Sequence, residues 1–436
     1  MAPPRRPPLW YRLGMRAAAG AAPLAARFNP KLAKGLEGRR QLLDRLTAWG
    51  SAYRDQSRPL IWMHAPSVGE GLQAKPVIEM LRSTHPEWQI AYTFFSPSAE
   101  RLARSLPVDV VDYLPWDRPD AVQGALEALK PTALVYSKLD VWPELTLGAA
   151  ARGVKLGLIS ATVSPTSSRL NWPARNWSRT AYEALDKIGA ISEADATRLE
   201  LLGARPSAMS VTGDTRYDSV LERAGRLDPT IDALTRLEVP AGGAFTVVAG
   251  STWPADEAVL LPTFADLRAQ VPTARLVLAP HEPNPDHLAG IATAATRAGL
   301  PRPVRLSQLS PGGVVPLVVV DRVGLLADLY AAGDVAFVGG GFHRAGLHSV
   351  LEPAAFAMPV IFGPRWGMSR DAGLLLEAGG AAALPEDGRH ALLARWSVWH
   401  HDAAQRRAAG LAARRVVEEG RGAAERTADL VRSLLA

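Results

Sequence analysis

The sequence predicts an α/β protein made of two Rossmann-like domains, each with a parallel sheet, that face a shared cleft. Two observations carry this prediction. Short apolar runs alternate with segments of helical periodicity along most of the chain, a pattern typical of parallel sheets covered by helices. The 436 residues also exceed a typical single domain, so two domains of about 200 residues are expected. Such sheets bind ligands at the carboxyl ends of their strands.

The first domain is predicted from a run of strands and helices. It starts with the apolar strand Leu60–His64, followed by a small-residue loop and a helix over Glu70–Arg82. The further predicted strands are Gln89–Phe95, Thr132–Ser137, Lys155–Ile159, Ile188–Ser192 and Ser210–Thr212. The further predicted helices are Ala99–Leu106, Pro143–Arg152 and Glu193–Gly203. This alternation indicates parallel pairing.

The second domain is predicted after an interruption of that rhythm. Residues 214–243 are charged and end in a Pro-Ala-Gly-Gly turn at 240–243, which indicates a connection between domains. The later strands are predicted at Phe245–Ala249, Arg275–Ala279, Val314–Val320 and Val335–Val338. Helical periodicity continues from His390 to Leu435. The expected division is therefore an N-terminal domain over 28–215, a linker over 216–243, and a C-terminal domain over 244–436 that includes the last helices.

Gly333–Pro364 has the pattern of a strand, a glycine loop, a helix and a strand, which indicates a nucleotide-sugar site. The glycines at 339–341 let backbone N–H groups approach a ligand. A helix is predicted to begin near Ser349, whose hydroxyl can cap it, and its N-terminus favours a phosphate. Glu352 is placed to accept hydrogen bonds from ribose hydroxyls. A purely structural glycine turn is the alternative.

Positive charge is concentrated at the N-terminus. Residues 1–58 carry 12 Lys or Arg and 3 Asp or Glu, a net charge of +9. Residues 1–27 combine apolar side chains such as Leu9 and Trp10 with arginines, and are predicted to form a basic amphipathic arm for an anionic membrane surface. The longest uncharged run there, Ala17–Ala26, is too short to span a bilayer. A disordered basic tail is the alternative. Nucleic acid is disfavoured, because the positive charge is confined to one end.

The composition also limits the chemistry. The chain has no cysteine, which excludes disulfides, thiolate metal sites and cysteine nucleophiles. Its nine histidines show no spacing typical of metal ligands. We therefore expect an enzyme without a metal or other cofactor.

Four motifs, in this order and spacing, carry a resemblance to a known family. They are WMHAPSVGEGLQAKPVIEML, GSTWPADE, LAPHEPNPDHL and the Gly333–Pro364 run. Together they resemble the 3-deoxy-D-manno-octulosonic acid (Kdo) transferases of lipopolysaccharide synthesis, from about Phe28 to Ala381. The spellings FNPKLAKGLEGRR and GGGFHRAGLHSVLE look most like the branch found in Bacteroidetes-type bacteria.

The resemblance implies a GT-B glycosyltransferase with an acceptor-binding N-terminal domain and a CMP-sugar-binding C-terminal domain. CMP-Kdo would be the donor and a lipid A precursor, lipid IVA, the acceptor, with inversion at the anomeric carbon. The enzyme would work at the cytoplasmic face of the bacterial inner membrane, without a metal.

The resemblance also assigns the catalytic residues. Glu70 matches the family's catalytic glutamate and is predicted to be the general base, since a sugar hydroxyl must lose its proton as CMP leaves. Arg216 stands where the family has a lysine thought to stabilise the transition state. Lys138 stands where most members have a glutamate, so it either pairs with a substrate anion or is structural. Glu37 and Asp140 are acidic alternatives better suited to the border of the acceptor site.

The donor site is assigned in the same way. The implied CMP-sugar-binding residues are Pro280, His281, Val323, Gly324, Leu325, Gly340, Gly341, Ser349, Val350, Leu351 and Glu352. The usual family spellings PRH and GGHNPLE become PHE and GLHSVLE. An arginine is therefore lost beside the nucleotide, where His281 can cover part of the loss, and Ser349 replaces an asparagine.

Two other functions stay open. A GT-B enzyme that uses another nucleotide-sugar would share the fold and Glu352, but would not be expected to carry the SVGE loop around Glu70. A non-catalytic, membrane-bound lipopolysaccharide-binding homologue would keep the fold and lose the base. Glu70 argues against that function, and Lys138 mildly favours it.

Overall fold

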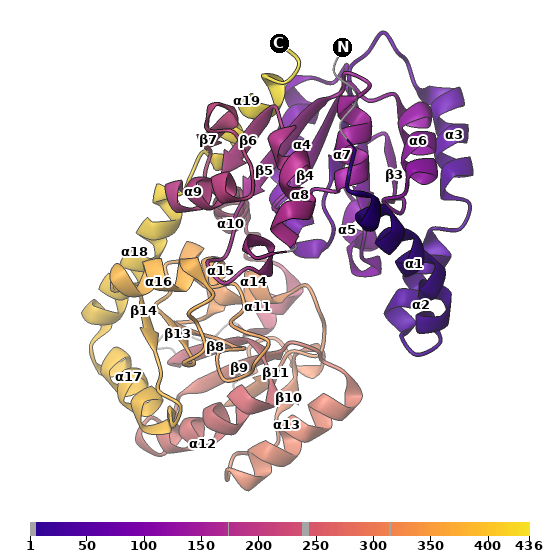
Figure 1. Ribbon diagram of the computed structural model, residues 1–436. Helices are drawn as coiled ribbons and strands as arrows, with labels where there is room; N and C mark the ends of the chain where they lie inside the picture. The colour runs from indigo at the N-terminus through magenta and orange to yellow at the C-terminus, as the bar shows by residue number, and fades with distance from the viewer. Residues whose placement is uncertain (1–5, 173, 238–243, 314) are drawn as a thin grey trace. The chain divides into compact units, whose positions relative to one another are not determined.

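The computed structural model describes residues 6–172, 174–237, 244–313 and 315–436. The chain divides into two compact units, of which the first contains the chain up to Ser219 together with 421–436, and the second contains Val220–Gly420. Each unit holds one parallel seven-stranded sheet covered by helices (Figure 1). The predicted α/β architecture with two parallel sheets is confirmed.

The sheet of the first unit has the strand order β3-β2-β1-β4-β5-β6-β7. Its strands are β1 (Leu60–His64), β2 (Gln89–Phe94), β3 (Val110–Tyr113), β4 (Ala133–Ser137), β5 (Lys155–Ala161), β6 (Lys187–Ala190) and β7 (Met209–Val211). The order reverses between β1 and β4, so the loops after these neighbouring strands diverge to opposite faces and leave room for functional side chains.

The helices of the first unit precede, connect and follow these strands. They are α1 (Leu9–Ala26), α2 (Pro30–Gly38), α3 (Leu42–Tyr53), α4 (Val68–Thr84), α5 (Glu100–Ala103), α6 (Pro119–Leu129), α7 (Pro143–Ala150), α8 (Ala174–Glu183), α9 (Glu193–Leu201) and α19 (Ala423–Arg432). The prediction named neither β3 nor the helices α2, α3, α6 and α8. β3 has no continuous apolar run because it contains Asp112, which is buried and paired with Arg45 of α3 at 2.7 Å.

The sheet of the second unit has the order β10-β11-β9-β8-β12-β13-β14. Its strands are β8 (Thr246–Thr252), β9 (Arg275–Pro280), β10 (Val304–Arg305), β11 (Leu317–Val319), β12 (Val335–Val338), β13 (Val360–Phe362) and β14 (Ala381–Ala383). Its helices are α11 (Asp232–Leu237), α12 (Pro254–Gln270), α13 (Pro285–Arg297), α14 (Leu326–Leu329), α15 (Leu351–Ala355), α16 (Arg370–Glu377), α17 (Arg389–His401) and α18 (Ala403–Glu419). α10 (Arg216–Gly225) contains residues of both units.

Short 3-10 turns complete the set of elements. They are η1 (Pro97–Ala99), η2 (Ser168–Leu170), η3 (Pro206–Ala208), η4 (Leu306–Gln308) and η5 (Tyr330–Ala332).

The N-terminal segment is helical from residue 9 and is attached to the first unit. Tyr11 donates its hydroxyl to Asp117 at 2.6 Å, and Arg12 forms a two-pronged ion pair with Glu144 at 2.6 Å. A disordered tail is therefore excluded for the residues of α1. Leu9 and its neighbour Trp10 stay exposed. Among the described residues, no helix is long and apolar enough to cross a bilayer.

Asp117 explains why this attachment forms. Its buried carboxylate accepts the Tyr11 hydroxyl and the backbone N–H groups of Glu144 and Leu145, which lie in the first turn of α7. Carboxylates are favoured at helix N-termini because the N–H groups there lack partners within the helix. Burial raises the pKa of Asp117 to about 6, although these hydrogen bonds oppose the shift.

The structure corrects the predicted domain boundaries. The last helix, α19, belongs to the first unit, where it packs on α4, β5 and β6. The Asp218 carboxylate accepts hydrogen bonds from the backbone N–H groups of Gly422 and Ala424, each at 2.7 Å. Periodicity identifies an amphipathic helix, but it does not say which sheet the helix covers. The predicted linker is helical over α10 and α11, and its predicted turn at 240–243 lies outside the described residues.

The packing of the C-terminal segment on the first sheet gives a first prediction. Leu434 is buried, and one of its methyl groups lies 2.9 Å from where a side chain on Gly157 of β5 would begin. Leu434→Ala should remove about 2–4 kcal/mol of stability from the first unit. Hydrogen exchange measured by mass spectrometry should accelerate in peptides covering β4–β6 and stay unchanged in peptides covering β8–β12. The control is Leu201→Ala, which truncates an exposed side chain of α9. Faster exchange confined to the second unit would contradict the assignment of α19 to the first unit.

Candidate active site and donor site

Glu70 lies where the first strand of the first unit passes into its helix. β1 ends at His64, and Glu70 stands in the first turn of α4. Its carboxylate accepts hydrogen bonds from the Ser67 hydroxyl and, at 3.1 Å, from Lys138 Nζ. Lys138 comes directly after β4, the neighbour of β1 in the sheet. The structure thus brings together two of the predicted catalytic residues as one ion pair at the carboxyl ends of adjacent strands.

Opposing effects set the charge of Glu70. The side chain is 15% exposed, and burial by itself would raise the pKa of the carboxyl. The Ser67 hydroxyl and the positive charge of Lys138 outweigh burial, so the pKa of Glu70 is lowered overall. Glu70 is therefore ionised in the free chain and holds a proton weakly as long as Lys138 stays beside it.

Lys138 is held in an unusual backbone conformation. Its φ of +67° lies in the left-handed region, which residues other than glycine rarely adopt. Its backbone N–H donates to Ile159 O of β5 at 2.8 Å, which anchors the residue at the strand end. Strained backbone of this kind is concentrated at functional sites. The position therefore favours a functional role for Lys138 over a purely structural one.

Arg216 is connected to the helix that carries Glu70. Its guanidinium binds the Asp214 carboxylate, with Nη2 at 2.6 Å from Oδ2 and Nε at 3.0 Å. Gln73 of α4 donates to the same carboxylate at 3.3 Å. Burial would raise the pKa of Asp214, but the charge of Arg216 lowers it overall. Asp214 therefore fixes Arg216 and is itself bonded to Gln73. Gln73 lies three residues after Glu70 on α4.

The acidic alternatives to Glu70 have other partners. Asp140 accepts from Trp142 Nε1 at 2.9 Å and contacts His64 Nε2 at 3.1 Å, and Arg169 lies 3.6 Å away. Burial opposes ionisation of Asp140, but these partners lower its pKa overall. Glu37 is exposed and pairs with Arg40. Both carboxylates therefore have partners other than the Glu70–Lys138 pair.

The glycine loop of the second unit is stabilised by Asp256 at the start of α12. The buried Asp256 carboxylate accepts from the backbone N–H groups of Gly340 at 2.8 Å, Phe342 at 3.1 Å and Trp253 at 2.9 Å. Gly339 N–H donates to Gly250 O of β8. The expectation that the N–H groups of these glycines approach a ligand is therefore wrong for Gly339 and Gly340.

The glycines are required by close packing instead. A side chain on Gly340 would begin 2.2 Å from Gly346 O, and one on Gly341 would begin 2.5 Å from the backbone nitrogen of Gly363. Gly340 also has a φ of +91°. The structural alternative for the glycine loop thus explains Gly340 and Gly341.

The helix after the loop also differs from the prediction. α15 begins at Leu351 with Val350 as its N-cap residue, and no side chain caps it. Ser349 therefore does not cap the helix, because the chain turns into the helix two residues later than the apolar pattern suggested. α15 has only five residues, so it offers no extended N-terminal anion site. Glu352 lies in its first turn, as predicted.

Three histidines surround Trp253 beside this loop. The Trp253 indole stacks on His343 with ring centroids 4.3 Å apart and on His281 at 4.7 Å. Trp253 Nε1–H donates to His348 Nε2 at 3.1 Å, so the proton of neutral His348 sits on Nδ1. Burial, followed by the neighbouring His281 and His343, lowers the pKa of His348 to about 4. His348 is therefore a neutral hydrogen-bond donor at physiological pH.

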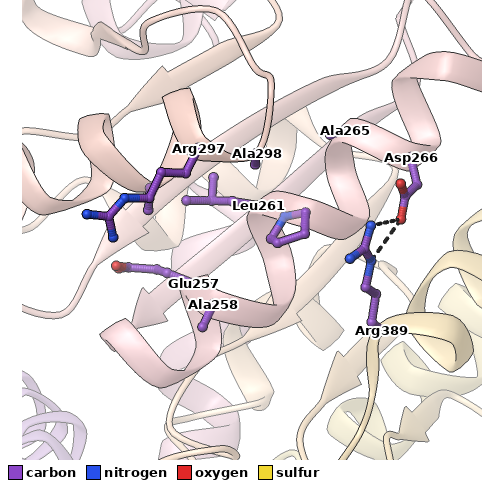
Figure 2. A pocket seen from close by; sticks show the side chains of 10 residues that line it. Glu257, Ala258, Leu261, Ala265, Asp266, Arg297, Ala298 and Arg389 are labelled. Carbon is purple, nitrogen blue, oxygen red and sulfur yellow. Dashed lines mark hydrogen bonds and ion pairs between the residues drawn. The ribbon is translucent and has the colours of Figure 1, made fainter.

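A cavity of about 440 Å³ opens beside this cluster. Trp253 and His281 line it together with Glu257 and His287, which are 2.9 Å apart. His281, a predicted residue of the donor site, therefore lines a cavity. The hollow in Figure 2, about 380 Å³ between α12, α13 and the Asp266–Arg389 ion pair, contains none of the predicted site residues.

Comparison with known proteins now identifies the family. The sequence profile of a family described as 3-deoxy-D-manno-octulosonic-acid transferase (kdotransferase) matches residues 38–219. The probable mitochondrial 3-deoxy-D-manno-octulosonic acid transferase of Arabidopsis thaliana is 30% identical over 335 residues, which cover 74% of this chain and 73% of that protein. The chain belongs to this family of glycosyltransferases. The 3-deoxy-D-manno-octulosonic acid transferase of Bordetella pertussis is 29% identical over 440 residues, covering 98% of this chain and 99% of that protein.

Solved structures agree with the fold expected for this Kdo transferase family. UDP-GlcNAc 2-epimerase from Neisseria meningitidis matches with a TM-score of 0.61 and 13% identity, covering 86% of this chain and 99% of that one. A glycosyltransferase from Rickettsia africae ESF-5 matches with a TM-score of 0.60 and 10% identity, covering 87% and 99%. At these identities the likeness concerns the fold alone, which is the predicted GT-B class.

Several residues of the two sites were missed by sequence reasoning. Asp214 and Gln73 fix Arg216, and Asp256 fixes the glycine loop. The signal for Asp256 was present, because Trp-Pro-Ala-Asp has proline at the first helical position and an acid two residues later. His343 carried no local signal. Among the described residues, no three histidine or carboxylate side chains gather in a way that could hold a metal ion, and metal independence stays a prediction.

The Glu70–Lys138 pair gives a prediction about titration. In Lys138→Gln the charge that lowers the pKa of Glu70 is lost while burial remains, so the pKa should move upward. Carbon-detected NMR of the Glu70 carboxyl during a pH titration would measure the shift. Lys75→Gln is the matched control, because Lys75 pairs with Glu79 on the exposed face of the same helix. An unchanged Glu70 titration in Lys138→Gln would contradict the balance described above.

Proposed function

We propose that the chain transfers Kdo from CMP-Kdo to a lipid A precursor, lipid IVA, in lipopolysaccharide synthesis, with inversion at the anomeric carbon. The observation that carries this proposal is the half-buried Glu70 carboxylate at the carboxyl end of β1, in a chain of the Kdo transferase family. Glu70 accepts the proton of the acceptor hydroxyl. The hydroxyl oxygen forms the new bond to the anomeric carbon, while the bond to the CMP phosphate oxygen breaks and CMP leaves with the electron pair.

Lys138 has a defined task in this proposal. In the free chain it lowers the pKa of Glu70, which makes Glu70 a weak base. An anionic group of the bound donor, its phosphate or the Kdo carboxylate, attracts the 44% exposed Lys138 side chain away from Glu70. Burial then raises the pKa of Glu70 and strengthens it as a base when substrate is present. Arg216, fixed by Asp214, supplies a second cation for the charge that develops on the leaving phosphate.

The donor nucleotide is held by the second unit. His281 and His348 provide N–H donors beside a cavity where the usual family arginine is absent, and Trp253 keeps their rings in place. Pro280 ends β9 directly before His281. Glu352 and Ser349 follow the glycine loop and are the proposed contacts to the ribose and the phosphate. Val350 and Leu351 are buried, so they support these residues rather than contact the nucleotide through their side chains.

The membrane is the proposed location of the acceptor. α1 exposes Leu9, Trp10 and Leu13, while Tyr11 and Arg12 hold the helix on the first unit. Aromatic and apolar side chains beside arginines suit an anionic bilayer surface. We therefore propose peripheral attachment to the cytoplasmic face of the inner membrane, with no role for nucleic acid.

Glu70→Gln tests the catalytic assignment. The amide keeps the size of the side chain but cannot take a proton, so transfer from CMP-Kdo to tetraacylated lipid A precursor should fall about 10²–10⁴-fold. CMP affinity, measured by calorimetry, should stay unchanged. Product formation is followed by mass spectrometry of the lipid.

The matched control is Glu79→Gln, which removes a partly exposed carboxylate on the same helix and should keep full activity. Full activity in Glu70→Gln would exclude Glu70 as the base. No product from the unmutated chain would leave the alternative of another nucleotide-sugar, or of a binding protein.

The combined change Trp10→Ser and Leu13→Ser tests membrane attachment. Both side chains are exposed on α1. Sedimentation with phosphatidylglycerol-containing vesicles should fall several-fold, because apolar area is lost from the interface. Trp172→Ser removes a tryptophan that is 80% exposed elsewhere in the same unit and is the control. Unchanged binding in the double variant would refute the role of α1.

A further inference from the structure

An arginine outside the predicted site holds the loop that carries Val323, Gly324 and Leu325. Arg223 of α10 forms a two-pronged ion pair with Asp328 of α14, with Nε 2.8 Å from Oδ1 and Nη2 2.9 Å from Oδ2. Two parallel N–H···O bonds fix the plane of the guanidinium as well as its position. Both residues belong to the second unit.

The same guanidinium reaches the loop backbone. Arg223 Nη2 lies 3.4 Å from Gly324 O, a long contact that depends on the ion pair for its direction. Gly324 has a φ of +91°, and a side chain there would meet no neighbouring atom, so its backbone conformation is what requires glycine. The other end of the loop is anchored by Asp321, which accepts from the backbone N–H and the hydroxyl of Ser307. Anchors at both ends restrict the loop.

The contacts of Arg223 also set its charge. The hydrogen bonds to Asp328 raise the pKa of Arg223, and the negative charge of Glu352 adds to this effect. The guanidinium therefore stays charged beside the Asp328 carboxylate and the Gly324 carbonyl.

We propose that Arg223 is a positioning residue of the donor site, which fixes the loop 323–325 in the arrangement that receives the nucleotide of a CMP-sugar. The inference rests on the proposed function. Val323 is 64% exposed, so little packing holds the loop in place. Without the Arg223 anchor the loop would be mobile before binding, and it would lose this conformational freedom when the nucleotide binds. That loss weakens binding. Arg223 thus acts on affinity for the nucleotide and not on the transfer step.

The test is Arg223→Gln in the full chain, with CMP itself as the probe. The dissociation constant for CMP, measured by calorimetry, should rise about tenfold, as expected when a charge-assisted pair worth about 1.4 kcal/mol is lost. The KM for CMP-Kdo should rise by a similar factor while kcat stays within about twofold. A merely structural role would not produce this division between KM and kcat.

Further variants identify the interaction responsible. Arg226→Gln is the matched control, because Arg226 follows directly after α10 and pairs with Glu222 of that helix, and it should leave CMP affinity unchanged. Asp328→Asn should weaken CMP binding as much as Arg223→Gln, and the double variant should lose no more than either change alone. Arg223→Lys keeps the charge without the two-pronged geometry and should recover part of the affinity.

The outcomes distinguish this inference from the proposed function. An unmutated chain that binds no CMP overturns the proposed function and the inference with it. Tight CMP binding by the unmutated chain together with unchanged affinity in Arg223→Gln overturns the inference alone. Losses that add in the double variant, or an equal loss in Arg226→Gln, would also overturn it.

Discussion

The candidate site of the first unit depends on one balance of charge, which is the balance at Glu70. Burial favours the neutral carboxyl, and Lys138 with Ser67 favours the carboxylate more strongly. The sheet order creates this balance, since β1 and β4 are neighbours although two strands separate them in sequence. Glu70 follows one of these strands and Lys138 follows the other. Lys138, which stands where the family usually has a glutamate, is therefore placed to set the charge of Glu70.

In the proposed function, the second unit holds a nucleotide without the usual arginine. The N–H groups of Gly339 and Gly340 are not free for a ligand, because Gly250 O and the Asp256 carboxylate already accept them. The proposed recognition therefore depends on side chains that other side chains position. Trp253 orients His281 and His348, which come from two different motifs, and Arg223 orients a loop. Such indirect support is expected where a site must be rigid before its ligand arrives.

The sequence predicted what local patterns determine. The strands Leu60–His64 and Val335–Val338 were predicted at their observed bounds because continuous apolar runs mark buried parallel strands. Glu70 was assigned from the resemblance of its SVGE loop to the family's motif. The packing of α19 on the first unit and the contacts of Asp256 and Arg223 could not be predicted in this way. They join residues about 80 to 200 positions apart, and no local periodicity records such pairing.

The charge of Glu70 in the presence of substrate tests the proposed role of Lys138 most directly. The measurement is a carbon-detected titration of the Glu70 carboxyl in the free chain and in the chain saturated with CMP-Kdo without acceptor. We predict that the pKa of Glu70 rises when CMP-Kdo binds, because Lys138 moves to the donor anion and burial then dominates. A pKa that stays the same or falls on binding would contradict it.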